Sequence, residues 1–190
     1  MADILIRRSP LQGWASRFAA RPTSASISEE PFLAMVDLWV DSSGPGGTAA
    51  SGVLGTALPT EPSTCRNGVI WFGPEEWLVT STDRDGQALE SALRDAVTPH
   101  GGAAVDVSAQ RTTVRLRGTH ARDVLAKGCA LDLHPTAFGV GAAAQTMLGL
   151  AAVVLIPLDS KGTDYRILVR SSFAGYLADW LLDATEEFSD

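Results

Sequence analysis

One short segment gathers three side chains that can bind a metal ion. Cys129, Asp132 and His134 fall within residues 129–134. Asp132 and His134 are two positions apart, so on a strand they would share one face. A zinc-type site needs about four converging ligands, and one carboxylate with one imidazole does not fix a metal. We interpret the segment as a His–Asp hydrogen bond or a turn at His134-Pro135.

Nucleophilic catalysis would need a Ser, Cys or Thr beside a base that a third group holds in place. The only histidines are His100, His120 and His134, and no GxSxG elbow is present. The glycine-rich stretches at 44–47 and 52–55 match neither the dinucleotide fingerprint nor the P-loop. The sequence therefore indicates no catalytic, cofactor-binding or metal-binding residue.

Two groups of side chains are better suited to contact another protein. Arg111, Arg115 and Arg117 form a basic row on one side of a predicted strand, which could meet an acidic surface or lie in solvent. Trp71 and Trp77 flank a turn, and tryptophan is enriched at protein interfaces. These five residues form the candidate partner interface, with a solvated sheet face as the alternative for the arginines.

The elements that would carry these residues follow from hydrophobic periodicity. Alternating patterns predict strands, and 3.6-residue patterns predict helices. Several neighbouring strands are joined by loops too short for a parallel crossover, so we predict an α+β fold with a mostly antiparallel sheet and helices packed on one face. The predicted strands are 32–41, 69–72, 77–82, 104–107, 112–117, 144–150, 152–156 and 165–170, and the predicted helices start near residues 86, 118 and 171.

The ends and loops of the chain are predicted from weaker signals. Residues 1–30 are weakly patterned and predict an N-terminal surface arm, which is either frayed or ordered by a partner. Residues 31–190 are expected to form a single α+β domain. The Ser/Gly/Pro run at 42–47 is typical of an exposed loop.

Composition limits the classes of partner. The 190 residues include 15 Lys and Arg against 22 Asp and Glu, a net charge of −7, and the pI is near 4.9. Nucleic-acid-binding domains are usually basic, so we expect no nucleic-acid partner. Two cysteines make no disulfide framework, and no apolar run is long enough for a membrane helix. We expect a cytoplasmic protein with no membrane contact.

Seven segments, taken in order, resemble the gamma subunit of heterotetrameric sarcosine oxidase. They run from about residue 7 to 184, and their order is more specific than any one of them. The segments are Arg8-Ser9-Pro10-Leu11, Gly73-Pro74-Glu75-Glu76-Trp77-Leu78, Val105-Asp106-Val107-Ser108-Ala109-Gln110-Arg111-Thr112, Gly118-Thr119-His120-Ala121-Arg122-Asp123-Val124-Leu125, Lys127-Gly128-Cys129-Ala130-Leu131-Asp132-Leu133-His134-Pro135, Ala144-Gln145-Thr146, and Arg170-Ser171-Ser172-Phe173-Ala174-Gly175-Tyr176-Leu177-Ala178-Asp179-Trp180-Leu181.

The resemblance implies a non-catalytic subunit that helps to assemble or stabilise a larger enzyme. That enzyme converts sarcosine to glycine and hydrogen peroxide, and releases the one-carbon unit as formaldehyde or 5,10-methylenetetrahydrofolate. The resemblance also implies partners, the alpha and other subunits, that hold FAD, FMN, NAD and tetrahydrofolate, with no cofactor in this chain. It implies a fold similar to the N-terminal region of the glycine-cleavage T-protein.

The T-protein-like fold leaves one alternative open, a stand-alone folate-binding one-carbon protein. A related iron–sulphur-assembly family has Tyr, Gly and Gln after a Lys-Gly-Cys motif. Here Lys127-Gly128-Cys129 is followed by Ala130, Leu131 and Asp132, so we transfer neither folate binding nor a reactive cysteine from that family.

Overall fold

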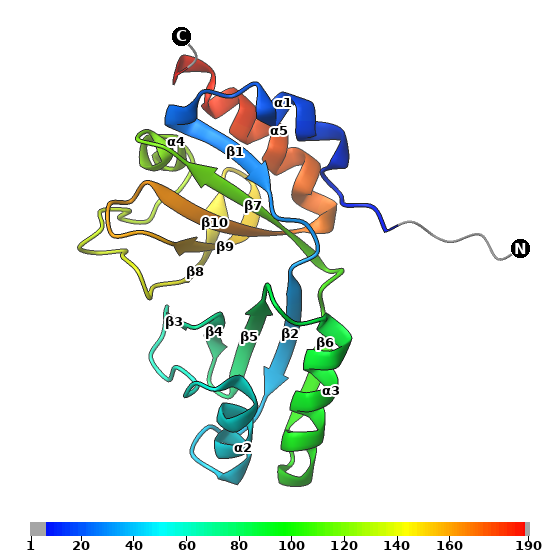
Figure 1. Cartoon of the computed structure of the whole chain (residues 1–190). Coiled ribbons are helices and arrows are strands. Elements are labelled where there is room, and N and C mark those ends of the chain that lie inside the picture. Colours follow the sequence, from blue (N-terminus) through cyan, green and yellow to red (C-terminus); the bar gives the residue numbers. More distant parts are fainter. Residues whose placement is uncertain (1–6, 189–190) are drawn as a thin grey trace, which may run out of the picture.

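The chain folds into two five-stranded antiparallel sheets with helices on their outer sides, as the computed structural model of residues 7–188 shows (Figure 1). Sheet A has the strand order β1-β7-β10-β9-β8, and sheet B has the order β3-β4-β5-β2-β6. The α+β class and the antiparallel pairing are confirmed, but the strands divide between two sheets where we expected one. Within the described residues, no helix has the length and hydropathy that a membrane crossing requires.

The element boundaries are as follows. The strands are β1 (Ser26–Glu29), β2 (Ala34–Trp39), β3 (Cys65–Arg66), β4 (Val69–Gly73), β5 (Glu76–Ser81), β6 (Ala103–Asp106), β7 (Arg111–Arg117), β8 (Ala144–Leu148), β9 (Ala151–Pro157) and β10 (Asp164–Arg170). The α-helices are α1 (Ala15–Ala19), α2 (Pro45–Leu54), α3 (Gly86–Val97), α4 (Ala121–Ala126) and α5 (Ala174–Ala184). Short 3₁₀ turns are η1 (Gln12–Trp14), η2 (Thr23–Ala25), η3 (Thr98–His100), η4 (Ser171–Phe173) and η5 (Glu186–Phe188).

Local sequence signals predicted several of these elements well. The β4–β5 hairpin is present, and its turn places Glu75 in the left-handed region with φ of 63°. Asp85 caps α3, because its Oδ1 accepts hydrogen bonds from the amides of Gln87 and Ala88. α5 forms where the strongest helical pattern lies, and it buries Leu177 and Leu181 completely.

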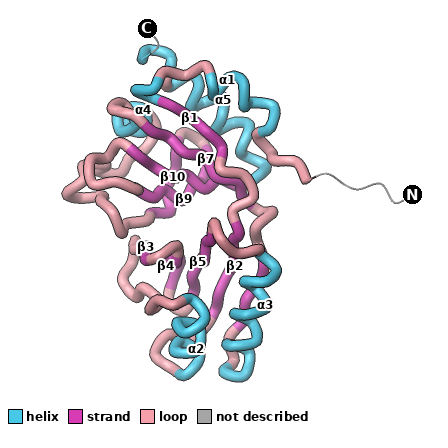
Figure 2. The backbone as a smooth tube through the Cα atoms, in the orientation of Figure 1, coloured by secondary structure: helices cyan, strands magenta, loops and turns pink. Residues whose placement is uncertain are grey.

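Helices α1, α4 and α5 lie beside sheet A, and helices α2 and α3 lie beside sheet B (Figure 2). α1, α4 and α5 pack on the outer side of sheet A, and α2 and α3 pack on the outer side of sheet B. The inner faces of the two sheets meet in a third, smaller apolar cluster, the inter-sheet core. It consists of Leu33, Met35, Ile70, Leu78, Ala143, Val154, Ile156 and Leu168.

Strand β2 shows the effect of this arrangement. Its alternation predicted Phe32 on the core side and Met35 on the opposite side. Instead Met35 is fully buried in the inter-sheet core, while Leu38 is fully buried under the helices of sheet B. Phe32 precedes the strand with φ of 65° and is 43% exposed. A strand buried on both faces does not show a single apolar side.

The segment expected to be an exposed loop around residues 42–52 instead contains helix α2. Pro45 opens the helix, where its fixed φ suits the first turn, and Gly55 ends it with φ of 66°. Gly46, Gly47 and Ala50 are buried, and α2 packs against α3. Tertiary packing of small residues therefore outweighs the poor helix propensity of glycine and serine.

The N-terminal segment is not a detached arm in the part that the structure describes. Leu11, Phe18 and Ile27 belong to the core on the outer side of sheet A, and β1 pairs with β7. Arg17 contacts Asp179 at 2.7 Å. Residues 7–29 are thus integrated with the C-terminal half of the chain, whereas residues 1–6 of the expected arm lie outside the described residues.

Two glycines of α2 make a matched test of this packing. We expect Gly47→Ala to lower the free energy of unfolding by about 2 kcal/mol, because overpacking strains a close-packed site and the new Cβ would lie 2.4 Å from the carbonyl oxygen of Ser42. We expect Gly52→Ala to raise it by about 0.5–1 kcal/mol, since nothing lies within 4 Å of its Cβ position and alanine favours the helix. Urea unfolding of the full chain measures both values, and effects of the same sign would contradict the proposed packing of α2.

Candidate functional site

The arginine row lies on the inner face of sheet A, where β7 and β10 are neighbours. Val114 and Leu116 of β7 face the outer core, as predicted, and the three arginines alternate with them on the other face. In the register of the two strands, Arg115 lies opposite Arg166 and Arg111 lies opposite Arg170. Each arginine of the row has a different environment.

Arg115 is held in an ion-pair network inside the chain. Its Nη1 donates to Glu30 at 2.7 Å and its Nε donates to Asp164 at 2.5 Å. Arg166 Nε donates to the other oxygen of Glu30 at 2.6 Å. We call these four residues the Glu30 network. Because the side chain of Arg115 is only 16% exposed and already paired, Arg115 does not form a free basic surface.

The network sets the charge state of its central carboxylate. Burial alone would raise the pKa of Glu30, but the hydrogen bonds from Arg166 and Arg115 outweigh it and leave the pKa below its ordinary value. The carboxylates likewise raise the pKa of Arg115, chiefly through the hydrogen bond to Asp164. Glu30 is therefore ionised at neutral pH.

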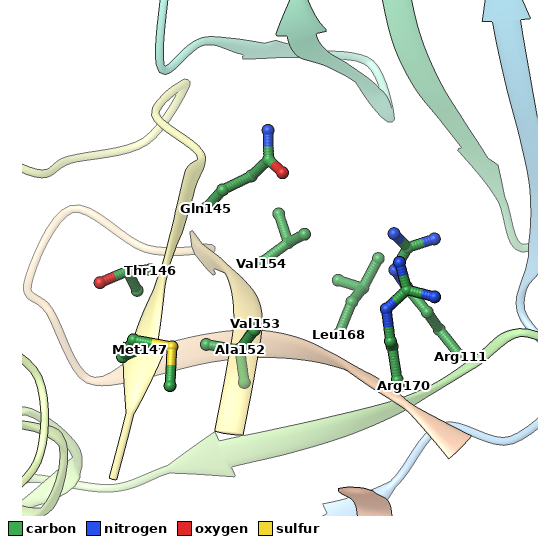
Figure 3. A pocket seen from close by; sticks show the side chains of 9 residues that line it. All are labelled: Arg111, Gln145, Thr146, Met147, Ala152, Val153, Val154, Leu168 and Arg170. Atoms are coloured by element: carbon green, nitrogen blue, oxygen red, sulfur yellow. The ribbon is translucent and has the colours of Figure 1, made fainter. Parts of the chain in front are cut away.

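Arg111 and Arg170 lie at the other end of the same strand pair and line a hollow of about 500 Å³ (Figure 3). Both guanidinium groups project toward the open space, on the same side as the amide of Gln145. Val154 and Leu168 belong to both the hollow and the inter-sheet core. We call this site the arginine hollow; it is lined by Arg111, Gln145, Thr146, Met147, Ala152, Val153, Val154, Leu168 and Arg170.

The electrostatics of the hollow are unbalanced. Burial, followed by repulsion from Arg170, lowers the pKa of Arg111. Asp37 and Glu76 of sheet B act in the opposite direction, but neither forms an ion pair with Arg111 in the described part of the chain. Oδ1 of Asp37 is buried and has no hydrogen-bond partner among the described residues. The hollow is suited to binding a carboxylate between its two guanidinium groups.

The remaining residues of the predicted interface are not brought together with Arg111. Arg117 is 53% exposed, with one 3.5 Å contact to Asp164. Trp77 is 1% exposed in the core of sheet B, and its Nε1 donates to the carbonyl of Pro59 at 2.7 Å. It therefore cannot contact a partner, which corrects that part of the prediction. Trp71, its cross-strand neighbour, is half-buried against the same core.

Sequence reasoning missed Arg170. It was assigned only to the end of a predicted strand, although it stands opposite Arg111 and lines the same hollow. The register of β10 against β7 is a tertiary property, so no local signal in the sequence indicated this pairing.

The side chains of His120 and His134 make hydrogen bonds to neighbouring polar side chains. The His134 amide donates to Asp132 Oδ1 at 2.9 Å, so this segment is a turn. His120 Nδ1 lies 2.9 Å from Asp123 Oδ2, and its ring stacks on Phe188. Within residues 7–188, no cluster of three or more His, Cys, Asp or Glu side chains could hold a metal ion.

The Glu30 network predicts a pH-dependent contribution to stability. We expect Glu30→Gln to cost about 2 kcal/mol at pH 7, because it leaves two opposed arginines without their shared anion. The pKa of Glu30 is lowered on folding, so its contribution is present above the unfolded pKa of about 4.5 and is lost as the pH falls through the lower folded pKa. Denaturant unfolding at pH 7 and pH 3 measures this difference.

A matched control for this prediction is Glu187→Gln. Glu187 accepts from Lys127 at 2.6 Å, but its side chain is 59% exposed, and exposed pairs contribute about 0–1 kcal/mol. Equal costs at the two positions, or a cost at Glu30 that does not shrink in acid, would contradict a stabilising role for the network.

Known proteins resemble this chain along most of its length. The model of the "Sarcosine oxidase, gamma subunit family" matches residues 41–187. Sarcosine oxidase subunit gamma of Corynebacterium sp. (strain P-1) is 32% identical over 97% of this chain and 92% of that protein. The subunit of the same name from Arthrobacter sp. is also 32% identical over the same shares.

Comparison with solved structures also finds a sarcosine oxidase. A chain of heterotetrameric sarcosine oxidase from Corynebacterium sp. U-96, in complex with pyrrole 2-carboxylate, matches with a TM-score of 0.87, 33% identity and 97% coverage of both chains. Glycine cleavage system aminomethyltransferase T from Bartonella henselae shares the fold, with a TM-score of 0.58 and 13% identity over 88% of this chain and 48% of that one. With a family model over residues 41–187 and relatives 32% identical along almost its whole length, this chain belongs to the sarcosine oxidase gamma subunit family.

Proposed function

We propose that this chain is the gamma subunit of a heterotetrameric sarcosine oxidase and that it serves the assembly and stability of the complex. The observation that carries the proposal is the match to a chain of such a heterotetramer over 97% of both chains, with a TM-score of 0.87. A match of this extent includes both sheets and their helices. The two chains therefore share the architecture of a whole subunit and not only one local site.

The proposal assigns the chemistry to the other subunits. In this assignment the alpha and other subunits hold FAD, FMN, NAD and tetrahydrofolate, and they oxidise sarcosine to glycine with release of hydrogen peroxide and the one-carbon unit. In this proposal the gamma subunit provides a contact surface for the other subunits and no catalytic residue. Two observations support this division. The ring nitrogens of His120 and His134 contact Asp123 and Thr136 rather than a Ser or Cys nucleophile, and the arginine hollow is suited to binding but contains no nucleophile beside a base.

The alternative of a stand-alone folate-binding protein is less well supported. It rests on likeness to an aminomethyltransferase at 13% identity, and a shared fold does not transfer a binding site. The proposal also includes a cytoplasmic location, in keeping with the free cysteines Cys65 and Cys129.

The test is to express the other oxidase subunits with and without this chain. We expect the yield of intact, flavin-containing complex to fall at least severalfold without it, because the remaining subunits lose an interface that stabilises them by mass action. Size-exclusion chromatography with flavin absorbance measures the yield, and hydrogen peroxide release measures sarcosine turnover per flavin.

Supplying the chain from a second plasmid is the control and should restore the yield. Unchanged assembly together with unchanged turnover in its absence would overturn the assembly role. An intact complex that forms without the chain but turns over slowly would instead place part of the chemistry in this subunit.

A further inference from the structure

The inner face of sheet A carries two arginine pairs that differ in one respect. In the antiparallel register of β7 and β10, Arg115 lies opposite Arg166 and Arg111 lies opposite Arg170. Thr113 and Leu168 lie opposite each other between them. Like charges directly opposite on neighbouring strands repel and destabilise the sheet, so an anion placed between the two guanidinium groups would stabilise each pair.

Among the residues that the structure describes, a carboxylate is shared between the two arginines of the first pair only. Glu30 follows β1 and places one carboxylate between the two guanidinium groups, with contacts of 2.7 Å to Arg115 and 2.6 Å to Arg166. Asp164 adds a second carboxylate, which accepts from Nε and Nη2 of Arg115. The first pair is thus held by one carboxylate shared by both guanidinium groups and by one further acid on Arg115.

The second pair has no such carboxylate within residues 7–188. Nη1 of Arg111 donates to the neutral amide oxygen of Gln110 at 2.9 Å, and its Cζ lies 5.6 Å from the ring centre of Phe72. Arg170 is exposed and takes part in none of the ion pairs of the described residues. Asp37 and Glu76 influence Arg111 from sheet B without pairing with it.

The surroundings of this pair are those of a protein interface. The arginine hollow has room for a side chain, with a volume of about 500 Å³, and its walls include Val154 and Leu168. Met147, which also lines it, is 48% exposed. Arginine and methionine are enriched in the centres of protein interfaces, and a guanidinium pair beside an apolar wall is complementary to an acidic side chain on an apolar segment.

We propose that an Asp or Glu side chain of a partner subunit enters the arginine hollow and bridges Arg111 and Arg170, as Glu30 bridges Arg115 and Arg166. The inference rests on the proposed function, because it takes the occupant from the assembled complex. The chain as a whole has a net charge of −7, so it does not attract an acidic partner over long distances. The attraction between the partner's carboxylate and the two arginines is therefore specific to this hollow.

The decisive variant is Arg170→Gln, because its effects on folding and on assembly have opposite signs. It removes the cross-strand repulsion, so the thermal midpoint of the isolated full chain should stay the same or rise. It also removes half of the carboxylate site, so the dissociation constant for the other subunits should rise by about tenfold or more. Differential scanning fluorimetry and surface plasmon resonance at two salt concentrations measure the two effects.

Arg170→Glu sharpens the test. Its carboxylate would lie opposite Arg111 and take the place of the partner's acid, so it should stabilise the isolated chain and weaken assembly further than Arg170→Gln. The matched control is Arg117→Gln, on the same face of β7 and 53% exposed; it removes the same charge outside the hollow and should change the dissociation constant less than twofold.

The outcomes separate this inference from the proposed function. If the wild-type chain does not bind the other subunits, the proposed function is wrong. If it binds and Arg170→Gln binds equally well with the same salt dependence, only the arginine hollow is wrongly assigned. A third measurement titrates the isolated chain with sodium benzoate. Binding that Arg170→Gln abolishes, alongside unchanged assembly, would assign the hollow to a small carboxylate and overturn the partner contact.

Discussion

The apolar contact between the two sheets is the constraint on which the remaining structure depends. Each sheet already buries its outer face under helices, and the inter-sheet core joins the inner faces through only a few side chains, such as Met35, Leu78 and Leu168. A charged side chain in this contact would lose its hydration, which is costly unless the charge is paired. The arginines of β7 and β10 lie on either side of Leu168, which belongs to the contact.

That constraint explains the pattern along β7 and β10. Thr113 and Leu168 occupy the middle of the strand pair, and an arginine pair stands on each side of them. One pair is neutralised from within by Glu30 and Asp164, and Glu30 also ties the end of β1 to the sheet. The other pair faces the arginine hollow. A subunit that presents an unneutralised site at one defined place can recognise a partner by charge and shape together.

Elements with strong local signals could be predicted from the sequence, and those that depend on distant contacts could not. The β4–β5 hairpin, α3 with its Asp85 cap, and α5 each follow from turn, cap or periodicity signals within a few residues. Helix α2 was missed because its glycines and serines disfavour a helix until α3 covers them. The N-terminal segment was missed because Leu11 and Phe18 pack against residues more than 100 positions away.

The sequence by itself determined the fold class, most of the strands and the family, because these depend on periodicity and on the order of motifs along the chain. The sequence also indicated the arginines of β7 as candidates for contact with a partner. Only the tertiary structure decided which of them is available, since burial removes Trp77, Glu30 and Asp164 occupy Arg115, and the register of β10 brings Arg170 to Arg111. The physical reason is that ion pairing and burial depend on neighbours in space, which a linear pattern does not contain.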